Sequence, residues 1–359
     1  MDTSKKPYSP EGLLLFALIV IYTARIIHSY EPFTFLNFDP GWQFIAVRSI
    51  AEDGDFDLRN QLENDPKQAA DQIALGVNGE WYNVHESLLP IVTVPFYWVF
   101  GLHGTLMFNA LLLLGTMMAV YRVGLASSSP AYCAIAVFIM AITLADWSYS
   151  YSVDVFGALL LVVTLLASIR ERYALAGLLF ALSIVGRLSN VASAPAFLYL
   201  ILSGKDPARS GVKFAAGALP VFALFLIFNW RMFGGPFEFS YFHQAYLVGD
   251  AFQVHSQQRL FSVNPFSGIK GILFDPQRGL IPSYPVTALA FVFGFRAWKE
   301  ANRRLLIACS LIGVGFLAFY STYAGAVELG GGTRHFLPLI VLSAIPLSCA
   351  LKQLSRKES

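Results

Sequence analysis

Blocks of mostly apolar residues recur along this chain, separated by short stretches that contain Arg, Pro, Gly or other polar residues. A helix that crosses the roughly 30 Å hydrocarbon core of a bilayer needs about 20 mostly apolar residues, and somewhat shorter blocks also serve. The pattern predicts about ten spanning helices in an all-α polytopic membrane protein. The predicted segments are Leu13–Ile27, Thr105–Tyr121, Ala131–Ala145, Val153–Ile169, Tyr173–Val185, Val191–Leu202, Val212–Phe228, Tyr284–Trp298, Leu305–Tyr323 and Phe336–Leu351.

The composition of the chain also places it in lipid. Of its 359 residues, 56% are hydrophobic and 13% are charged, whereas an ordinary soluble domain carries roughly 25% charged residues. Lys5 and Lys6 precede the first apolar segment, and no small-residue cleavage site follows it. We therefore expect this segment to remain as an anchor. Residues 1–351 are expected to form a single transmembrane domain, followed by a cytoplasmic tail at residues 352–359.

Basic residues between the segments predict which side of the membrane each loop faces. If Lys5 and Lys6 are cytoplasmic, the large basic clusters are cytoplasmic too, as the positive-inside rule requires. These clusters are Arg170/Arg172, Lys205/Arg209/Lys213, Arg296/Lys299/Arg303/Arg304 and Lys352/Arg356/Lys357. Both termini are then inside, and the two long loops, about residues 29–87 and 231–283, are outside. We therefore expect the functional site on the extracytoplasmic face.

The apolar segment Leu88–Gly101 does not fit this topology as a span, because counting it would place every later basic cluster outside. It has only about 14 residues, and it contains Pro90 and Pro95, which interrupt helical hydrogen bonding. Backbone that does not span the membrane is tolerated at that depth where protein or a wet cavity shelters it. We predict a re-entrant or interfacial helix that forms part of a cavity wall.

The first outer loop begins and ends with polar residues that suit chemistry. Asp39 followed by Pro40 is typical of a helix start. The residues up to Gly54 predict an amphipathic helix at the interface, with Gln43 on its polar side. Taken alone, Asp39 is better explained as a helix cap than as a catalyst. His85 and Glu86 directly precede the predicted re-entrant helix, and a His there is typical of a hydrogen-bonding or acid–base group.

Four arginines are predicted at the outer ends of helices, where the positive-inside rule works against them. They are Arg187, Arg231, Arg278 and Arg334. Together they favour an anionic partner such as phosphate, which a guanidinium binds through two parallel hydrogen bonds. For each arginine taken singly, a salt bridge with Asp146, Asp154 or Glu238 is the competing explanation.

Several other chemistries have no signal in the sequence. There is no G-x-G-x-x-G motif after a strand and no P-loop, so we expect neither a soluble nucleotide donor nor nucleic acid as a partner. No GxSxG or HExxH motif occurs, and His85 has no HxxxH or HxxE partner. We therefore predict no metal site and no cofactor, with a divalent ion left open.

Six blocks in a fixed order carry a resemblance to a known family. They are FDPGWQFIAVRSIAEDGDFDLRN, GEWYNVHESLLPIVTVPFYWVFG, GRLSNVASAPAFLYLIL, NWRMFGGPFEFSYFHQ, GILFDPQRGLIPSYPV and GGGTRHFLPLIVL. In order and sidedness they resemble the polytopic GT-C glycosyltransferases, a superfamily that includes protein mannosyltransferases and aminoarabinose transferases. The resemblance implies sugar transfer from a polyprenyl-phosphate donor to an acceptor hydroxyl, with inversion, on the outer face of a bacterial inner membrane.

The same resemblance implies roles for particular side chains. Asp39 stands in the position of the family's first-loop acid and is expected to act as general base. The side chains expected to hold the lipid phosphate are Arg334, His335, His85 and Arg187. Those expected to line the substrate cavity are Glu86, Glu238, Tyr241 and Asp154. The partners are then a polyprenyl-phosphate sugar, membrane lipids and an acceptor, which is a glycan, a lipid or a protein.

Two other classes of protein compete with this interpretation. A transporter or lipid flippase predicts internal repeats and charges near the bilayer midplane, whereas the charges here are at the predicted helix ends and no repeat is found. A non-catalytic assembly partner with the same scaffold stays open. Pro40, Gly41 and Trp42 follow Asp39, where the family usually has a second acidic residue or a Tyr.

Overall fold

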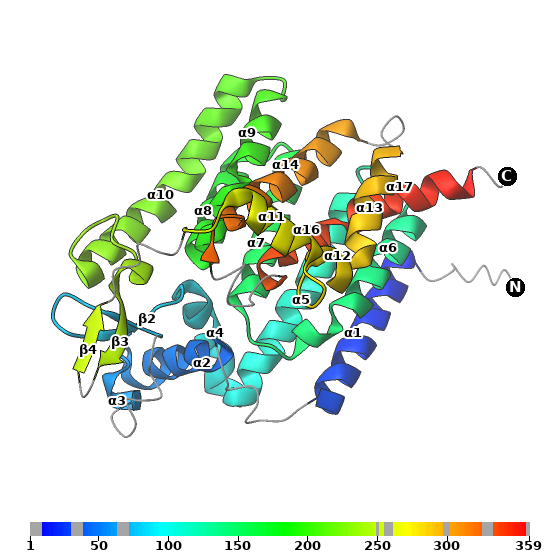
Figure 1. Ribbon diagram of the computed structural model, residues 1–359. Helices are drawn as coiled ribbons and strands as arrows, with labels where there is room; N and C mark the ends of the chain where they lie inside the picture. Colours follow the sequence, from blue (N-terminus) through cyan, green and yellow to red (C-terminus); the bar gives the residue numbers. More distant parts are fainter. Residues whose placement is uncertain are drawn as a thin grey trace, which may run out of the picture.

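The computed structural model describes residues 9–29, 39–62, 72–248, 251–254, 261–296, 302–324 and 333–356. Within these ranges the chain is mostly helical (Figure 1). The α-helices are α1 Pro10–Ser29, α2 Asp39–Arg48, α3 Arg59–Leu62, α4 Leu88–Phe100, α5 Leu102–Gly124, α6 Pro130–Thr143, α7 Val153–Ile169, α8 Tyr173–Gly186, α9 Ala194–Leu202, α10 Pro207–Phe233, α11 Pro265–Phe274, α12 Leu280–Ser283, α13 Pro285–Arg296, α14 Arg303–Tyr320, α16 Leu337–Leu342 and α17 Ala344–Ser355. The tighter or wider helical turns are η1 Ser49–Asp53, η3 Ala145–Ser148, η4 Leu188–Ser193, η5 Ser240–His243 and η6 Arg334–Phe336. The strands are β1 Ile73–Leu75, β2 Trp81–Asn83, β3 Gln244–Val248 and β4 Ala251–Val254.

Within the described ranges, each predicted apolar segment falls mainly on helix. In the described ranges, five helical runs are long and apolar enough to cross a membrane by length and composition: α1, α5, α10, α14 and the run Arg334–Ser355. The other predicted segments fall on apolar helices of 10–17 residues. The prediction of a helical polytopic membrane protein is therefore confirmed.

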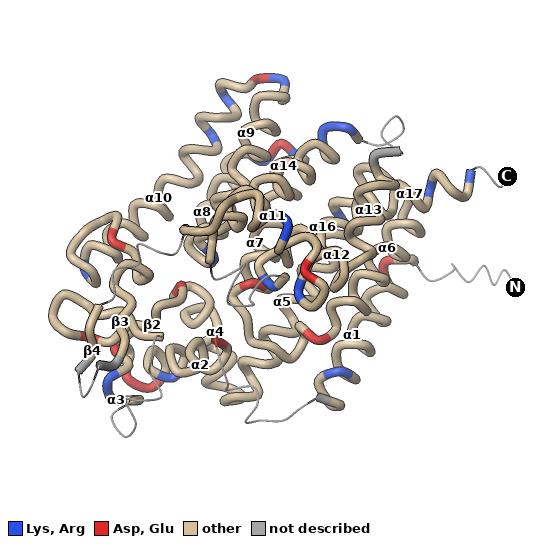
Figure 2. Tube along the Cα trace, in the orientation of Figure 1, with Lys and Arg blue, Asp and Glu red and all other residues tan. Residues whose placement is uncertain are grey.

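Ion pairs between helix ends show that α5 runs in the direction opposite to α1 and α6. Arg122, in the last turn of α5, pairs with Glu11 in the first turn of α1. At the opposite end, Arg25 near the end of α1 pairs with Asp146, which follows α6. Figure 2 shows that basic residues gather at the starts of α10 and α14 and along α17, away from the strands. Basic clusters that are distant in the sequence thus share one end of the bundle.

The centre of the bundle is the packing of α7 and α8 against α5 and α10. Two glycines allow α8 and α10 to touch through their backbones: a Cβ at Gly177 would overlap the carbonyl group of Phe214, and one at Gly217 that of Ala174. Small residues at helix crossings permit this close approach in membrane proteins. The contact fixes where α10 lies relative to the rest of the bundle.

A small antiparallel sheet joins the two long segments that were predicted to lie outside, and the all-α prediction missed it. The strand order is β2-β1-β3-β4, with Ile73 paired with both Asn83 and Ala245. β1 and β2 come from the first outer segment, and β3 and β4 from the second. Strands of three to five residues are too short to show a clear alternation of apolar and polar positions. Their pairing depends on contacts between distant parts of the chain.

The helix predicted after Asp39 is present as α2 and continues as η1, which ends at Gly54 with a left-handed backbone, φ 78°. Its buried face differs from the prediction. Gln43, expected on the polar side, is only 1% exposed, because α2 packs between α4 and the sheet. The helix is therefore part of the packed structure and does not expose a continuous polar face.

The predicted re-entrant helix is α4, which has 13 residues and contains Pro95. At 1.5 Å per residue it is about 20 Å long, shorter than the hydrocarbon core. It packs against α5 and α2, with Leu89 and Val94 buried and Trp98 exposed. Its re-entrant placement in a membrane stays a prediction.

Replacing Gly177 with Ala should lower the melting temperature in detergent, because the new methyl group would overlap the backbone of α10 and overpacking typically costs about 1–3 kcal/mol. Gly115→Ala is the matched control, since a Cβ there meets only Leu159, at 3.6 Å. The control should melt close to the wild type. Equal melting temperatures for the two variants would contradict the close contact of α8 with α10.

Candidate functional site

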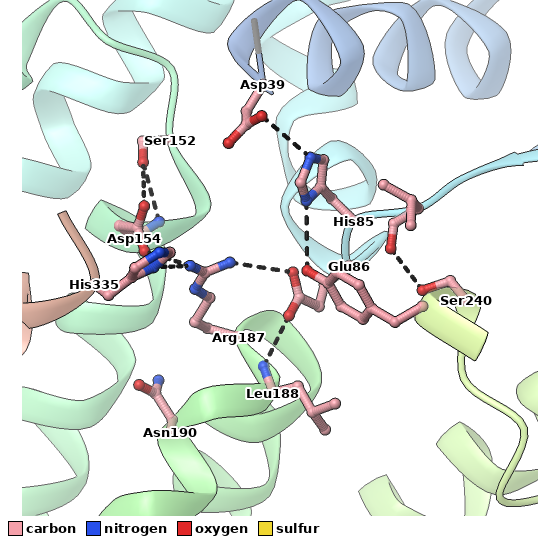
Figure 3. Close-up of polar contacts among 12 residues, drawn as sticks. Asp39, His85, Glu86, Ser152, Asp154, Arg187, Leu188, Asn190, Ser240 and His335 are labelled. Atoms are coloured by element: carbon pink, nitrogen blue, oxygen red, sulfur yellow. Dashed lines mark hydrogen bonds and ion pairs between the residues drawn. The ribbon is translucent and has the colours of Figure 1, made fainter. Parts of the chain in front are cut away.

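Charged side chains from separate parts of the chain lie close together (Figure 3). Each comes from the end of an element. Asp39 begins α2, Glu86 precedes α4 and Asp154 lies in the first turn of α7, while Arg187 connects α8 to η4 and His335 lies in η6. The starts of α2, α4 and α7 and the end of α8 therefore lie close together, next to η6.

Arg187 is the centre of the more buried half of this cluster. Its Nη2 lies 2.9 Å from Asp154 Oδ1 and 2.9 Å from His335 Nδ1, and its Nη1 lies 3.9 Å from Glu86 Oε2. The side chain of Arg187 is 12% exposed, and those of Glu86 and Asp154 are 9% and 8% exposed. A charge this buried needs opposite charge around it. Arg187 thus forms an ion pair with Asp154, one of the carboxylates named in the salt-bridge explanation.

The start of α7 is built to hold Asp154 against this guanidinium. Ser152 caps the helix by accepting a hydrogen bond from the Asp154 N–H at 3.1 Å. This places the carboxylate in the first turn, where the helix dipole favours negative charge. One turn later, a Cβ at Gly157 would lie 2.8 Å from Arg187 Cβ. The glycine leaves the space that Arg187 occupies.

His335 supports Arg187 as a hydrogen-bond acceptor. A guanidinium can only donate, so His335 Nδ1 must accept the bond from Arg187 Nη2. The imidazole also stacks on Tyr320, with ring centroids 4.6 Å apart and planes 16° from parallel. The ring is 5% exposed. In this arrangement His335 presents no positive charge to an anion.

Asp39 belongs to the more open half of the cluster, together with His85 and Arg334. Its Oδ2 accepts a hydrogen bond from Arg334 Nη1 at 2.5 Å, and its Oδ1 lies 3.5 Å from His85 Nε2. Burial alone would raise the pKa of Asp39, but the hydrogen bond and charge of His85, and then Arg334, outweigh burial and hold it well below its usual value. The carboxylate is therefore ionised at neutral pH.

Tyr241 and Gln72 fix the ring of His85 from two sides. His85 Nε2 lies 2.9 Å from Gln72 Oε1, and Nδ1 lies 3.4 Å from the Tyr241 hydroxyl group. The pKa of Tyr241 is raised well above its usual value, first by burial and then by the charge of Glu86. Tyr241 therefore keeps its proton and can donate a hydrogen bond. It contacts the open half of the cluster and interacts electrostatically with the buried half.

A cavity of about 330 Å³ opens beside the cluster. His85, Glu86 and Tyr241 contribute to one part of its wall, and the remainder is mainly apolar side chains from α4, α8 and α10 such as Ile91 and Phe225. A mostly apolar pocket of this size with a few convergent polar groups is typical of a small-molecule binding site.

Not every predicted site residue joins the cluster. Glu238 does not line the cavity; it pairs with His243 at 3.0 Å, and its side chain is 49% exposed. Arg231 and Arg278 form no ion pair within the described ranges, unlike the other two predicted outer arginines. The structure thus brings two of the four arginines to one place.

Three residues at the site were not predicted: Gln72 and Tyr320, which contact the histidines of the cluster, and Asn229, which lines the cavity. Gln72 and Tyr320 reach the cluster through the sheet and α14, and nothing local in the sequence marks them. Asn229 did carry a signal, because a carboxamide near the end of the apolar helix α10 is unusual. It is 3% exposed and lines the cavity.

The cluster contains more carboxylates than guanidinium groups, but its charges differ in exposure. The side chain of Arg334 is 42% exposed, which makes it the guanidinium that an anion from outside can reach. In the described part of the chain, no group of three or more His, Cys, Asp or Glu side chains is arranged to hold a metal ion. The arrangement can bind an anion at Arg334 and accept a proton at the adjacent Asp39.

The fold matches that of ArnT from Cupriavidus metallidurans. The ArnT structure with undecaprenyl phosphate superposes with a TM-score of 0.59 and 15% identity, over 96% of this chain and 60% of that chain. The apo ArnT structure gives a TM-score of 0.58, with the same identity and coverage. This chain therefore shares the fold of ArnT, and it spans 60% of the length of that protein. No family model and no curated protein matches the sequence.

Removing the carboxylate of Asp154 should strongly destabilise the protein. Asp154→Ala leaves the guanidinium of Arg187 buried with its nearest counter-charge gone, which typically costs about 3–5 kcal/mol. Asp146→Ala is the control, because it breaks the exposed pair with Arg25, in which the Asp side chain is 65% exposed, and such pairs contribute roughly 0–1 kcal/mol. Denaturant or thermal unfolding in detergent measures both. Similar losses would contradict the buried pairing.

The depressed pKa of Asp39 predicts a specific dependence of stability on pH. A carboxylate with a lower pKa in the folded state stabilises the protein above its unfolded pKa of about 4, and this contribution is lost as the pH falls through the folded pKa. The difference in melting temperature between wild type and Asp39→Asn should therefore be largest near neutral pH and shrink in acid. A constant difference down to about pH 3 would contradict the ion pairing of Asp39.

Proposed function

We propose that this protein is a glycosyltransferase of a bacterial inner membrane that transfers a sugar from a polyprenyl-phosphate donor to an acceptor hydroxyl group. The observation that carries the proposal is the contact between Asp39 and the half-exposed Arg334, beside an apolar cavity. A base and an anion-binding group are what such a transfer requires. The shared fold with ArnT, which was solved with undecaprenyl phosphate, supports a lipid phosphate as the leaving group.

Arg334 is the side chain that we assign to the lipid phosphate. Arg187 is already committed to Asp154 and His335, whereas Arg334 is more exposed. A phosphate oxygen competes with Asp39 for the guanidinium of Arg334, since both are anions that bind it in the same way. His85 is the second group within reach of that position, and Arg187 and His335 support the site from the buried side.

Asp39 is the group that we assign as general base. While Arg334 and His85 hold its pKa low, its carboxylate is a weak proton acceptor. When the donor phosphate draws Arg334 away, Asp39 loses a positive neighbour and its pKa rises. Donor binding would therefore strengthen the base that the next step needs.

The proposed transfer is a single displacement at the anomeric carbon. Asp39 takes the proton of the acceptor hydroxyl group while the hydroxyl oxygen bonds to the anomeric carbon. The bond from that carbon to the phosphate oxygen breaks, and the lipid phosphate leaves with its charge stabilised by Arg334. Attack from the side opposite the leaving group inverts the anomeric centre.

The predicted cavity residues take different parts in this proposal. Glu86 and Tyr241 line the cavity and are assigned to the sugar or the acceptor. Asp154 acts through Arg187, and Glu238 takes no part in the proposed site. The apolar wall suits either the lipid chain next to its phosphate or the apolar face of a sugar ring. The acceptor class stays open between a glycan, a lipid and a protein.

The proposed topology keeps both termini in the cytoplasm and the site on the extracytoplasmic face, with residues 1–351 as one transmembrane domain. The gathering of basic residues at the end of the bundle away from the strands supports it (Figure 2). The location of the buried charges at helix ends favours this enzyme over a transporter, which needs charges near the midplane.

A transfer assay tests the proposal. Wild-type protein in liposomes should transfer labelled hexose or pentose from a polyprenyl-phosphate donor to a membrane extract. Asp39→Asn should lower kcat by roughly 10²–10⁴-fold, and Arg334→Ala should mainly raise the donor KM. Asp146→Asn, which alters an exposed ion pair with Arg25, serves as the control with activity close to wild type.

Each outcome of this assay bears on a separate assignment. Full activity in Asp39→Asn would overturn the assignment of the base. An unchanged donor KM in Arg334→Ala would place the phosphate elsewhere. No transfer by the wild type from any donor would favour the non-catalytic assembly partner.

A further inference from the structure

Asn229 is a buried polar group that neither the fold nor the proposed chemistry uses. It lies in the last two turns of α10, is 3% exposed and lines the cavity. Its Nδ2 is buried and has no hydrogen-bond partner among the residues that the structure describes. Because an unpaired buried donor is destabilising, such groups normally have a partner. This donor therefore points to a ligand in the cavity.

Glu86, in the wall of the same cavity, has a carboxylate oxygen that accepts no hydrogen bond from the described residues. Its Oε1 accepts a hydrogen bond from the Leu188 N–H at 2.9 Å. Its Oε2 is buried without a hydrogen bond, since Arg187 Nη1 is 3.9 Å away. The cavity wall thus contains a donor, Asn229 Nδ2, and an acceptor, Glu86 Oε2, and neither makes a hydrogen bond with the described residues.

The two groups together indicate the chemical class of the ligand. A hydroxyl group both donates and accepts, so hydroxyl groups can satisfy Asn229 and Glu86 together. A phosphate only accepts and would be repelled by the Glu86 carboxylate, and an isoprenoid chain does neither. The rest of the wall, with Leu88, Leu224 and Phe225, is apolar and suits the C–H face of a sugar ring. A hydroxylated sugar ring meets all of these conditions.

We propose that Asn229 and Glu86 bind ring hydroxyl groups of a sugar in this cavity, and that Asn229 thereby helps to determine which sugar is accepted. The inference deepens the proposed function and rests on it for the source of the sugar, which is the lipid-linked donor or a glycan acceptor. A site that hydrogen-bonds a substrate hydroxyl group strongly rejects an analogue that lacks it, because the buried groups are then left unpaired.

Two substitutions separate this role from a structural one. Asn229→Leu keeps a similar volume without a donor, and Asn229→Asp keeps the shape but replaces the amide donor with an acceptor. Since Nδ2 of Asn229 makes no hydrogen bond, Asn229→Leu should melt at or above the wild-type temperature. Asn109→Leu is the matched control: its buried Nδ2 donates to the carbonyl groups of Trp147 and Ser148 at 2.7 and 3.3 Å, so this variant should melt lower.

Binding of defined probes to the full chain in detergent tests the ligand class. The probes are undecaprenyl phosphate, its hexosyl and pentosyl derivatives with matched deoxy sugars, and free methyl glycosides. Wild type should bind one sugar-bearing probe at least about tenfold tighter than its deoxy analogue. Both Asn229 variants should lose that preference and bind undecaprenyl phosphate as the wild type does. If the preference is lost only for the sugar-bearing lipids, the bound sugar is that of the donor. If it is lost only for the methyl glycosides, the bound sugar is that of the acceptor.

The results that would overturn the inference are distinct from those that would overturn the proposed function. An unchanged sugar preference in both Asn229 variants, an equal loss of undecaprenyl phosphate binding, or no sugar binding by the wild type would each overturn the inference, whatever the transfer assay shows. Sugar binding that depends on Asn229, without transfer from any donor, would leave the inference standing and overturn the proposed glycosyltransferase activity.

Discussion

The buried charge of Arg187 is the constraint on which the rest of the site depends. A guanidinium that is 12% exposed in an apolar bundle persists only with compensating partners. Asp154, Glu86 and His335 provide them from the start of α7, the segment before α4 and the turn η6. Satisfying one buried cation therefore holds several helix ends at the same level. The more open groups, Asp39, His85 and Arg334, lie beside these helix ends.

The two guanidinium groups of the site differ in exposure and in the number of their partners. Arg187 is enclosed and has its partners from within the chain, whereas Arg334 is 42% exposed and has one carboxylate partner, Asp39, in the described ranges. An exposed pair exchanges partners at lower cost than a buried one, because water compensates each separated charge. This difference is the physical basis for assigning the incoming phosphate to Arg334, and it ties anion binding to the basicity of Asp39.

The second of the two long predicted outer segments completes the site, which the first cannot form alone. Tyr241, next to the sheet, contacts His85 from one side, and Gln72, just before β1, contacts it from the other. The sheet itself pairs β1 of the first segment with β3 of the second. The cavity wall likewise combines α4 with α10 and η5. The same fold recurs in ArnT at 15% identity.

The sequence by itself determined the helical membrane class, the positions of the apolar helices and the candidates Asp39, His85, Arg187 and Arg334. These are local properties: apolar length sets a helix in lipid, and a charge next to an apolar block stands out because burying it is costly. Only the tertiary structure decided the partners. The Arg334–Asp39 contact joins residues 295 positions apart, and the short strands pair across distant segments. The burial of Gln43 and Asn229 and the exposure of Glu238 follow from which helix ends meet, and no local pattern encodes that.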